Sequence, residues 1–309
     1  MSDKPPLEPT AGDRLADLAQ PAAAAPASAP GGFLLPDHRV LALTGRDAVA
    51  FAQAQTMNDV AGLAEGHWQW NGWLTPKGRL LALFALLRTA PDTVWWLLPD
   101  ADPQALAERL RRFVFRSKVA IEVRDDLRVS GAFAAPASAR GARLAGDAGL
   151  EDAGLELDLG AADDPRTLRI GTAGAADDPA AVARWRAFDL HHGLPRLAPD
   201  QAEQWTPQQL SLERLHAYSV KKGCYPGQEI VARTHFLGQA KRGLALFEDA
   251  DGVAPPGTRL SAADDAGGGT VVACAPGLAL AVMPAGPAVP AVTGEATLSP
   301  LPLLPGLAR

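Results

Sequence analysis

Short apolar runs separated by turn-forming residues dominate the chain from residue 33 onward. Residues 68–74 and 80–87 are two such runs, and the segment TPKG at 75–78 joins them. Proline suits the second position of a turn and glycine the last, so this pattern predicts a β-hairpin. Further strands are predicted at 40–43, 93–98, 119–123, 127–133 and 167–172.

Two predicted helices have the same start signal. Asp102-Pro103 and Asp178-Pro179 each place a capping side chain before a proline at the first helical position. These helices are expected to run to about residue 112 and residue 192, and a third helix is expected over about 47–53. Because the strand runs come in hairpin-like pairs between helices, the pattern favours α+β layers over a doubly wound parallel sheet.

The character of the sequence changes at both ends of the chain. Residues 1–32 are rich in alanine and proline, with almost no large apolar side chain to bury, which predicts a disordered tail. From residue 243 the runs LALF, TRLS, TVVACA, LALAVM and ATLSPL alternate with glycine, proline and aspartate, a pattern typical of a small β-barrel. We therefore expect a tail at 1–32, a folded α+β region at 33–242 and a β-barrel domain at 243–309.

Composition narrows the class of protein. The 309 residues are 47% hydrophobic and 21% charged, which is typical of a globular chain with substantial cores. The 29 basic and 35 acidic residues give a net charge of -6, which argues against a surface built to coat nucleic acid. The sequence has neither a secretory signal pattern nor an apolar run of membrane-spanning length, so we expect a cytoplasmic protein without a membrane partner.

The two cysteines stand in different sequence settings. The segment KKGCYPGQE at 221–229 places Cys224 after two lysines and between two glycines. Nearby cations and loop N–H groups stabilise a thiolate, and the glycines and proline disfavour regular structure at Cys224, so this cysteine is a candidate functional thiol. A packing role is the open alternative, because most free cysteines are buried. Cys274, within the apolar run TVVACA, is expected in the core.

No metal site is predicted, because two distant cysteines and the adjacent pair His191-His192 form no ligand pattern.

The segment KGCYPGQEIVAR at 222–233 resembles the signature of the YgfZ-type folate-binding proteins, paralogues of the aminomethyltransferase (T-protein) of glycine cleavage. The segments LALTGRDAVAFAQAQTMNDV, LTPKGRLLALFALLR, RRFVFRSKVAIE, GLPRL and PQQLSLERL are similar to other parts of this family and extend the resemblance over most of 33–243. The resemblance implies a T-protein-like fold of two α+β lobes around a central cavity, plus a small C-terminal β-barrel. Its implied ligand is tetrahydrofolate or a related folate.

The resemblance also implies a function. Members of the family support the assembly or repair of iron–sulfur enzymes and, through one of them, a tRNA modification. Iron–sulfur enzymes or cluster assembly proteins are the implied partners, and direct binding of tRNA is not expected. Cys224 would supply the functional thiol, with Lys222 beside it. The alternative is a folate-dependent one-carbon transferase or demethylase, but the hairpin segment 71–78 lacks the acidic residue that aminomethyltransferases carry there.

Four positions are candidate folate contacts. Trp185 matches an aromatic residue that lies against the folate in the family, although its helical stripe also fits a core position. His38 falls where a relative has a tryptophan, and Gln228 belongs to the signature segment. Arg79 is a candidate partner for the glutamate tail of the folate. The pair His191-His192 stands where relatives often carry an acidic residue that binds the pterin.

Overall fold

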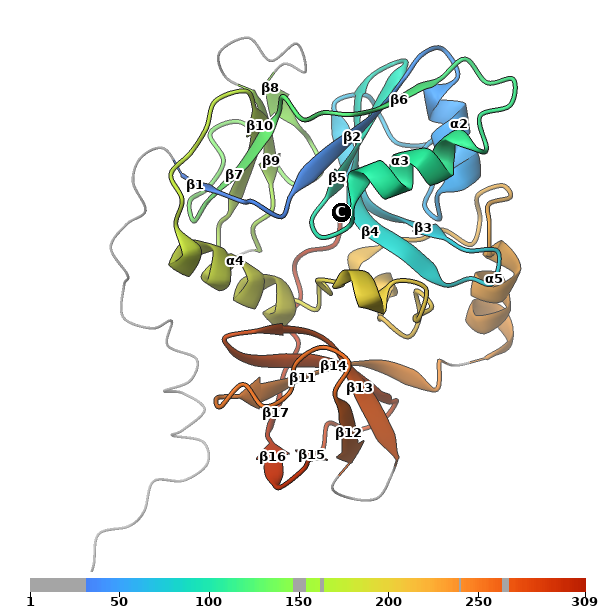
Figure 1. The fold of residues 1–309 in the computed structure, drawn as a ribbon. Coiled ribbons are helices and arrows are strands. Elements are labelled where there is room, and N and C mark those ends of the chain that lie inside the picture. The colour runs from blue at the N-terminus through green and yellow to red at the C-terminus, as the bar shows by residue number, and fades with distance from the viewer. Residues whose placement is uncertain (1–31, 147–153, 162–163, 239, 263–266) are drawn as a thin grey trace, which may run out of the picture.

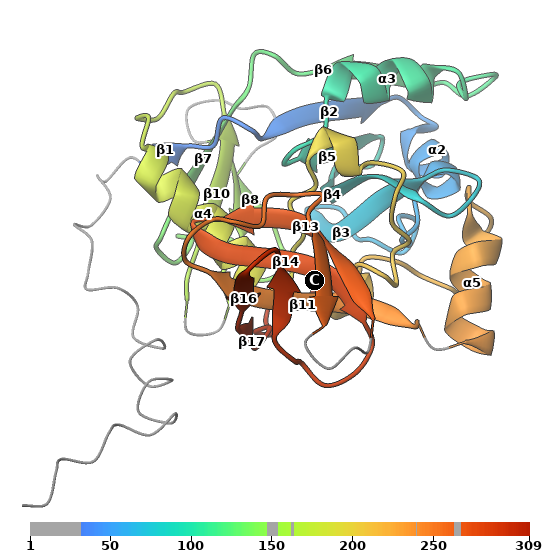
Figure 2. The ribbon, with the colours of Figure 1, turned by 60° about the horizontal axis from the view of Figure 1, so that its bottom comes forward.

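Three antiparallel sheets form the framework of the protein. The computed structural model describes residues 32–146, 154–161, 164–238, 240–262 and 267–309, so the predicted tail lies outside it except for Gly32. Two mixed lobes stand side by side, and a β-barrel lies below both (Figure 1). Figure 2, with the barrel turned toward the viewer, shows its strands crossing in front of the lobes. The predicted α+β class and the C-terminal barrel are confirmed.

The first lobe contains the predicted hairpin. Its strand order is β3-β4-β5-β2-β6, and all neighbouring strands are antiparallel. The amide of Gly78 donates to the carbonyl of Thr75 across 2.9 Å, which closes the turn where the sequence predicted it. The elements of this lobe are β2 (Arg39–Thr44), α2 (Ala48–Gln55), β3 (His67–Leu74), β4 (Leu80–Ala90), β5 (Thr93–Leu98), α3 (Pro103–Arg111) and β6 (Ala120–Val123).

Both faces of the first sheet are buried, against different partners. Successive side chains of a strand point to opposite faces. Phe84 and Trp96 point to the face covered by α2 and α3, where their rings stack at 4.2 Å. Trp68 and Trp70 on β3 point to the other face, toward the second lobe. This second face therefore forms one wall of the centre of the molecule.

The second lobe has the strand order β1-β7-β10-β9-β8, with helix α4 packed on the sheet. As predicted, the side chain of Asp178 accepts a hydrogen bond from Ala181 N at the start of α4. Trp185 lies directly over Gly131 of β7, where any side chain would collide with the indole at 2.9 Å. The elements are β1 (Phe33–Leu34), β7 (Arg128–Ala132), β8 (Ala145–Gly146), β9 (Leu155–Asp158), β10 (Thr167–Gly171) and α4 (Pro179–His191).

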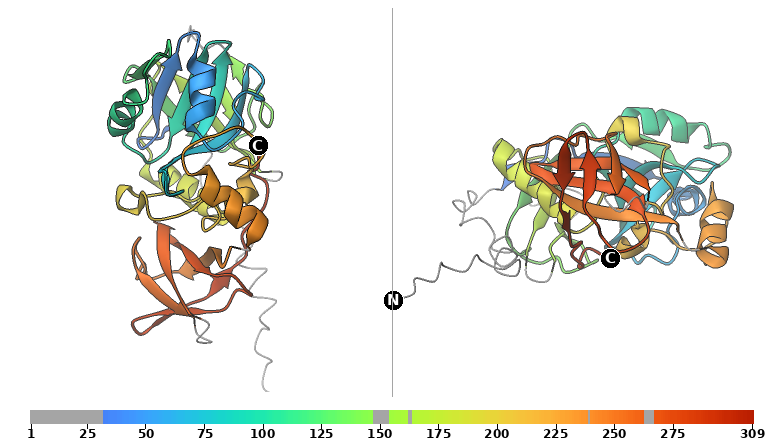
Figure 3. Two further views of the ribbon diagram at one scale, coloured as in Figure 1. Left: turned by 90° about the vertical axis from the view of Figure 1, so that its right-hand side faces the viewer. Right: turned by 90° about the horizontal axis from the view of Figure 1, so that it is seen from below.

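A segment of short helices connects the second lobe to the barrel. It contains the 3₁₀ turns η1 (Pro199–Gln201) and η2 (Leu212–Leu215) and the helix α5 (Gln228–Leu237), which the sequence pattern did not predict. Helix α5 stands beside the tip of the β3–β4 hairpin (Figures 1 and 3). Across the described ranges, no helix is both long and apolar enough to cross a membrane.

The barrel is a nearly closed sheet with the strand order β16-β15-β12-β13-β14-β11-β17. Its strands are β11 (Arg242–Asp249), β12 (Arg259–Ala262), β13 (Gly268–Ala275), β14 (Gly277–Pro284), β15 (Ala291–Thr293), β16 (Ala296–Leu298) and β17 (Pro300–Leu301). After β17 the chain leaves the barrel and runs up between the two lobes (Figure 1).

Cys274 is exposed, so the prediction that it lies in the core is wrong. Val271 faces the interior of the barrel, whereas Val272 and Ala273 belong to the central core that includes α4. Both faces of β13 are therefore covered along most of its length, and the sequence shows an unbroken apolar run. Cys274 lies near the end of β13 and lines a surface pocket together with Pro179 at the start of α4.

Candidate functional site

The loop that carries Cys224 leads directly into helix α5. Cys224 is exposed, whereas Tyr225 beside it is buried. Gly227 caps α5 with a positive φ of 80°, a conformation that favours glycine. A Cβ atom on Gly227 would lie 2.6 Å from the carbonyl oxygen of Thr75 and 2.7 Å from Cα of Gly78. The loop is thus packed against the hairpin turn, backbone to backbone.

Lys222 fixes the other side of this loop. Its side chain is buried, and the ammonium donates to the carbonyls of Gln53, Thr56 and Asn58, with distances of 2.5 Å to Thr56 and 3.1 Å to Asn58. Burial lowers the pKa of Lys222 to about 8. Two of these carbonyls belong to the last turn of α2 and its cap, which lack helical partners and form the negative end of the helix dipole. Lys222 therefore holds the Cys224 loop to the end of α2.

The other predicted residues near this loop also hold the backbone in place. The side-chain Nε2 of Gln228 donates to the carbonyl of Lys222 across 3.3 Å, and so stabilises the turn around Cys224. Arg79 donates to the carbonyl of Gln204 at 2.6 Å and to Oε1 of Gln209 at 3.1 Å. The predicted folate contacts of Gln228 and Arg79, and the predicted action of Lys222 on the thiol, stay predictions.

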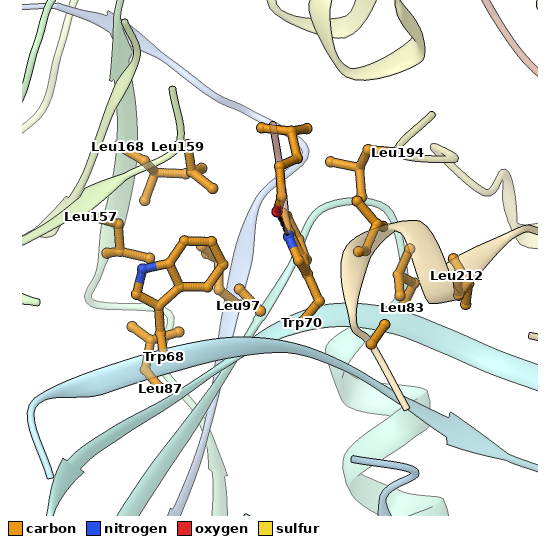
Figure 4. Packing of buried hydrophobic residues seen from close by; sticks show 14 of the residues in the cluster. Trp68, Trp70, Leu83, Leu87, Leu97, Leu157, Leu159, Leu168, Leu194 and Leu212 are labelled. Carbon is orange, nitrogen blue, oxygen red and sulfur yellow. Dashed lines mark hydrogen bonds between the residues drawn. The ribbon is translucent and has the colours of Figure 1, made fainter. Parts of the chain in front are cut away.

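A second group of residues lies in the interior, where the two lobes meet. Trp68 and Trp70 project from β3 toward leucines of the second lobe (Figure 4). Their rings meet edge to face at 5.3 Å, and the indole N–H of Trp68 donates to the carbonyl of Gly141. The surrounding apolar side chains shown there are Leu83, Leu87, Leu97, Leu157, Leu159, Leu168, Leu194 and Leu212. An aromatic and aliphatic wall of this kind suits a flat, largely apolar ligand.

His38 and Trp185 line one small cavity beside this wall. The cavity has a volume of about 20 Å³, room for one water molecule, and Trp70 and Asp189 also line it. His38 is 7% exposed, and its Nδ1 atom has no hydrogen-bond partner. Burial, followed by the charges of Arg196 and other arginines, lowers the pKa of His38 well below 6.5. His38 is therefore a neutral imidazole at pH 7, with one nitrogen available to a ligand.

The indole of Trp185 is enclosed by protein on several sides. It is 1% exposed, and the guanidinium of Arg166 covers its ring at 4.1 Å from the centroid. Phe33 meets its ring edge to face at 5.8 Å, and Phe133 lies at 6.0 Å. These contacts account for Trp185 as a core residue of the second lobe, and stacking of this indole on a folate stays a prediction.

Four charged side chains, three of them buried and Asp100 partly buried, join the two lobes. Asp189 lies 2.8 Å from Arg166, at an angle poor for a hydrogen bond, and 3.0 Å from Arg196, which lies 2.8 Å from Asp100 of the first lobe. Burial alone would lower the pKa of Arg196, but the carboxylates of Asp100 and Asp189 hold it above its usual value. Each of these charges thus has at least one partner of opposite sign.

The sequence did not indicate that the segment 303–309 belongs to this centre. The indole N–H of Trp70 donates to the carbonyl of Leu307 across 2.7 Å, and Nδ1 of His192 lies 2.7 Å from the carbonyl oxygen of Pro305. The pair His191-His192 thus contacts this segment at the position where the family resemblance implies an acidic pterin ligand. The run WQWNGW at 68–73, with three tryptophans, was an available signal for an aromatic site.

Comparisons with known proteins place the chain in a family. The tRNA-modifying protein YgfZ of Cronobacter sakazakii is 31% identical over 231 residues, which cover 68% of each chain. This chain belongs to the YgfZ family. The protein of the same name from Vibrio vulnificus is 28% identical over 240 residues, with 74% of this chain and 73% of the relative covered. An uncharacterised Haemophilus influenzae protein is 27% identical over 217 residues, with 69% and 72% covered.

The fold is that of an aminomethyltransferase T. The solved structure of the glycine cleavage system aminomethyltransferase T from Bartonella henselae superposes with a TM-score of 0.61, over 88% of this chain and 85% of that one. Its sequence is 14% identical, so this similarity concerns the fold alone. The predicted T-protein-like fold is confirmed. No protein-family model matches this YgfZ family member.

Proposed function

We propose that this YgfZ family member is a cytoplasmic, folate-binding accessory protein that supports the assembly or repair of iron–sulfur enzymes and so affects tRNA modification indirectly. The observation that carries the proposal is an exposed thiol on a fixed loop. Cys224 faces solvent, while Lys222 and Gly227 on either side are locked to α2 and to the hairpin. The relatives named tRNA-modifying protein YgfZ support the link to tRNA.

A fixed, exposed thiol suits brief contact with iron in a partner. Thiolates are the usual protein ligands of iron–sulfur clusters, and a cluster takes about four of them. The described residues contain no group of three or more His, Cys, Asp and Glu side chains able to hold a metal ion. In the proposed role Cys224 therefore supplies one ligand and the client enzyme or assembly protein supplies the others.

The interior wall has the chemistry of a pterin site but not, in this conformation, its volume. The indoles of Trp68 and Trp70 offer flat surfaces, and Nδ1 of His38 offers an unused hydrogen-bonding atom. The free cavity of about 20 Å³ is far smaller than a pterin needs, because leucines and Trp70 enclose it, and the segment 303–309 packs against Trp70. Binding thus requires this segment to move. A bound reduced folate would carry one-carbon units beside these residues.

We do not propose aminomethyl transfer. The hairpin segment 71–78 contains no carboxylate, and the buried polar side chain of Asn71 in this segment is an amide. Oδ1 of Asn71 accepts from the backbone amides of Asn58 and Gly72 at 2.9 and 2.8 Å, so it is committed to the backbone. A neutral amide is not a general base, and the activity lacks its expected proton acceptor.

Titration calorimetry with tetrahydrofolate tests the folate part of this proposal. We expect a dissociation constant in the micromolar range or weaker, because the site must open before the ligand enters. His38→Phe should weaken binding, since it removes the available ring nitrogen and fills the cavity. Cys224→Ser is the control and should bind as the unaltered protein does. Absence of any heat change up to millimolar ligand would remove folate from the proposed function.

A further inference from the structure

The segment 303–309 is held in the centre of the molecule by polar contacts and by the buried side chain of Leu307. It receives hydrogen bonds from side chains of three different elements, and its own Leu304 N donates to the carbonyl of His191 across 2.8 Å. The side chain of Leu307 is 2% exposed, whereas Leu304 beside it is 41% exposed. The donors to its carbonyls are Arg214 to Leu303 and Leu304, His192 to Pro305, and Trp70 to Leu307. The segment is thus bound like a peptide ligand.

Arg309 connects this segment to the second lobe. Its Nη2 atom donates to two backbone carbonyls of the second lobe, those of Asp158 at 3.1 Å and Gly160 at 2.8 Å. The guanidinium also lies over the indole of Trp68, 5.5 Å from the ring centroid. Its Nη1 atom donates to the carbonyls of Gly306 and Ala308 in its own segment. This half-buried group therefore meets one aromatic face and two acceptors of the second lobe at once.

The contacts of Arg309 indicate which kind of chemical group could bind in its place. Two carbonyl acceptors beside an aromatic face suit a planar group whose edge carries adjacent N–H donors. The 2-amino-4-oxopyrimidine ring of a pterin has such an edge, since its amino group and ring N–H are arranged as in a guanidine. Trp70, which holds the segment through Leu307, also lines the cavity of His38 and Trp185, so the two sites adjoin.

We propose that Trp68 and the carbonyls of Asp158 and Gly160 form the subsite for the aminopyrimidine edge of the folate, and that Arg309 occupies this subsite when no folate is bound. The inference rests on the proposed folate function and adds an internal competitor to it. Folate and Arg309 of the segment 303–309 then occupy this subsite in a mutually exclusive manner. The segment acts as a strap that lowers the apparent affinity in proportion to its occupancy.

Calorimetric titration of tetrahydrofolate into matched arginine variants tests the proposal. Arg309→Ala should bind about tenfold more tightly than the unaltered protein, because the competing group is gone. Arg128→Ala is the control, since Arg128 also donates to two backbone carbonyls but is the exposed first residue of β7, and the affinity of this variant should be unchanged. Adding Trp68→Leu to Arg309→Ala should remove the gain.

The outcomes separate the inference from the function on which it rests. Equal affinity of the unaltered protein and Arg309→Ala, or weaker binding by Arg309→Ala, overturns the inference and leaves folate binding intact. No binding by either folded protein overturns the proposed folate function itself.

A second measurement needs no variant. Saturating the unaltered protein with tetrahydrofolate should shift the indole N–H resonance of Trp70, because its hydrogen bond to Leu307 breaks. If folate binds and this resonance keeps its position, the strap does not leave and the inference is wrong.

Discussion

Replacing Lys222 by methionine should destabilise the protein and release the Cys224 loop. Methionine keeps most of the length of the apolar stem but removes the ammonium, so the carbonyls of Gln53, Thr56 and Asn58 lose a donor in a buried place. Lys221→Met is the matched control. Lys221 is the exposed neighbour in the chain, and its replacement should change the free energy of unfolding little.

The magnitude follows from the three contacts. A hydrogen bond from a charged donor contributes about 1.5–3 kcal/mol, so the three together are worth roughly 5–9 kcal/mol before the cost of burying the charge. That cost is substantial, as the lowered pKa of Lys222 shows. We expect a net loss of about 3 kcal/mol, which corresponds to a fall of about 6–12 °C in melting temperature.

Urea unfolding and a pH series measure this effect. The pKa of Lys222 is about 8 in the folded chain against its usual 10.5, so the folded protein loses this proton first as the pH rises. Between pH 8 and 10.5 the unfolded chain binds more protons than the folded chain. As the pH rises through this range, the free energy of unfolding of the unaltered protein should therefore increase relative to that of Lys222→Met. A Lys222→Met variant within about 0.5 kcal/mol of the unaltered protein would refute the anchoring role.

Four other predictions follow from the packing. Gly227→Ala should destabilise by about 2 kcal/mol or more in urea unfolding, because a Cβ atom there meets backbone at 2.6 Å and the φ is positive. Asp189→Asn should cost about 3–5 kcal/mol by the same assay, since it leaves buried guanidinium groups poorly compensated. His38 contributes stability that is present above pH 6.5 and lost as the pH falls through its lowered folded pKa, so His38→Gln should flatten the acid side of the stability profile. Native alkylation by iodoacetamide, followed by mass spectrometry, should label Cys224 before Cys274, because burial raises the pKa of the Cys274 thiol; equal rates would contradict this.

The elements that the sequence predicted correctly are determined by residues adjacent to one another in the chain. The hairpin turn needs only the proline and glycine of TPKG, and two helix starts need only an aspartate before a proline. Helix α5 was missed because it has no side-chain cap and begins at a glycine in left-handed conformation, which reads as a loop. The position of Cys274 was wrong because an apolar run covered on both faces gives no alternation.

The candidate site depends on contacts that cross the whole chain. From the local sequence, Lys222 is expected to be a surface charge. Its burial depends on contacts with the end of α2, more than 160 residues earlier in the chain. Trp70 and Leu307 are 237 positions apart, and nothing in the residues around either of them predicts that they meet. The family resemblance predicted the lobes and a central site, but not the segment that fills the site in this structure.

The most direct measurement for the proposed function is the activity of iron–sulfur enzymes in cells that lack the native protein and produce a defined variant. Cys224→Ser should keep its melting temperature, because the side chain is exposed, and should fail to restore enzyme activity. Cys274→Ser, the other exposed cysteine, should fold and restore activity at the same protein level. Full restoration by Cys224→Ser at the normal protein level would contradict the account, since the thiol would then be dispensable.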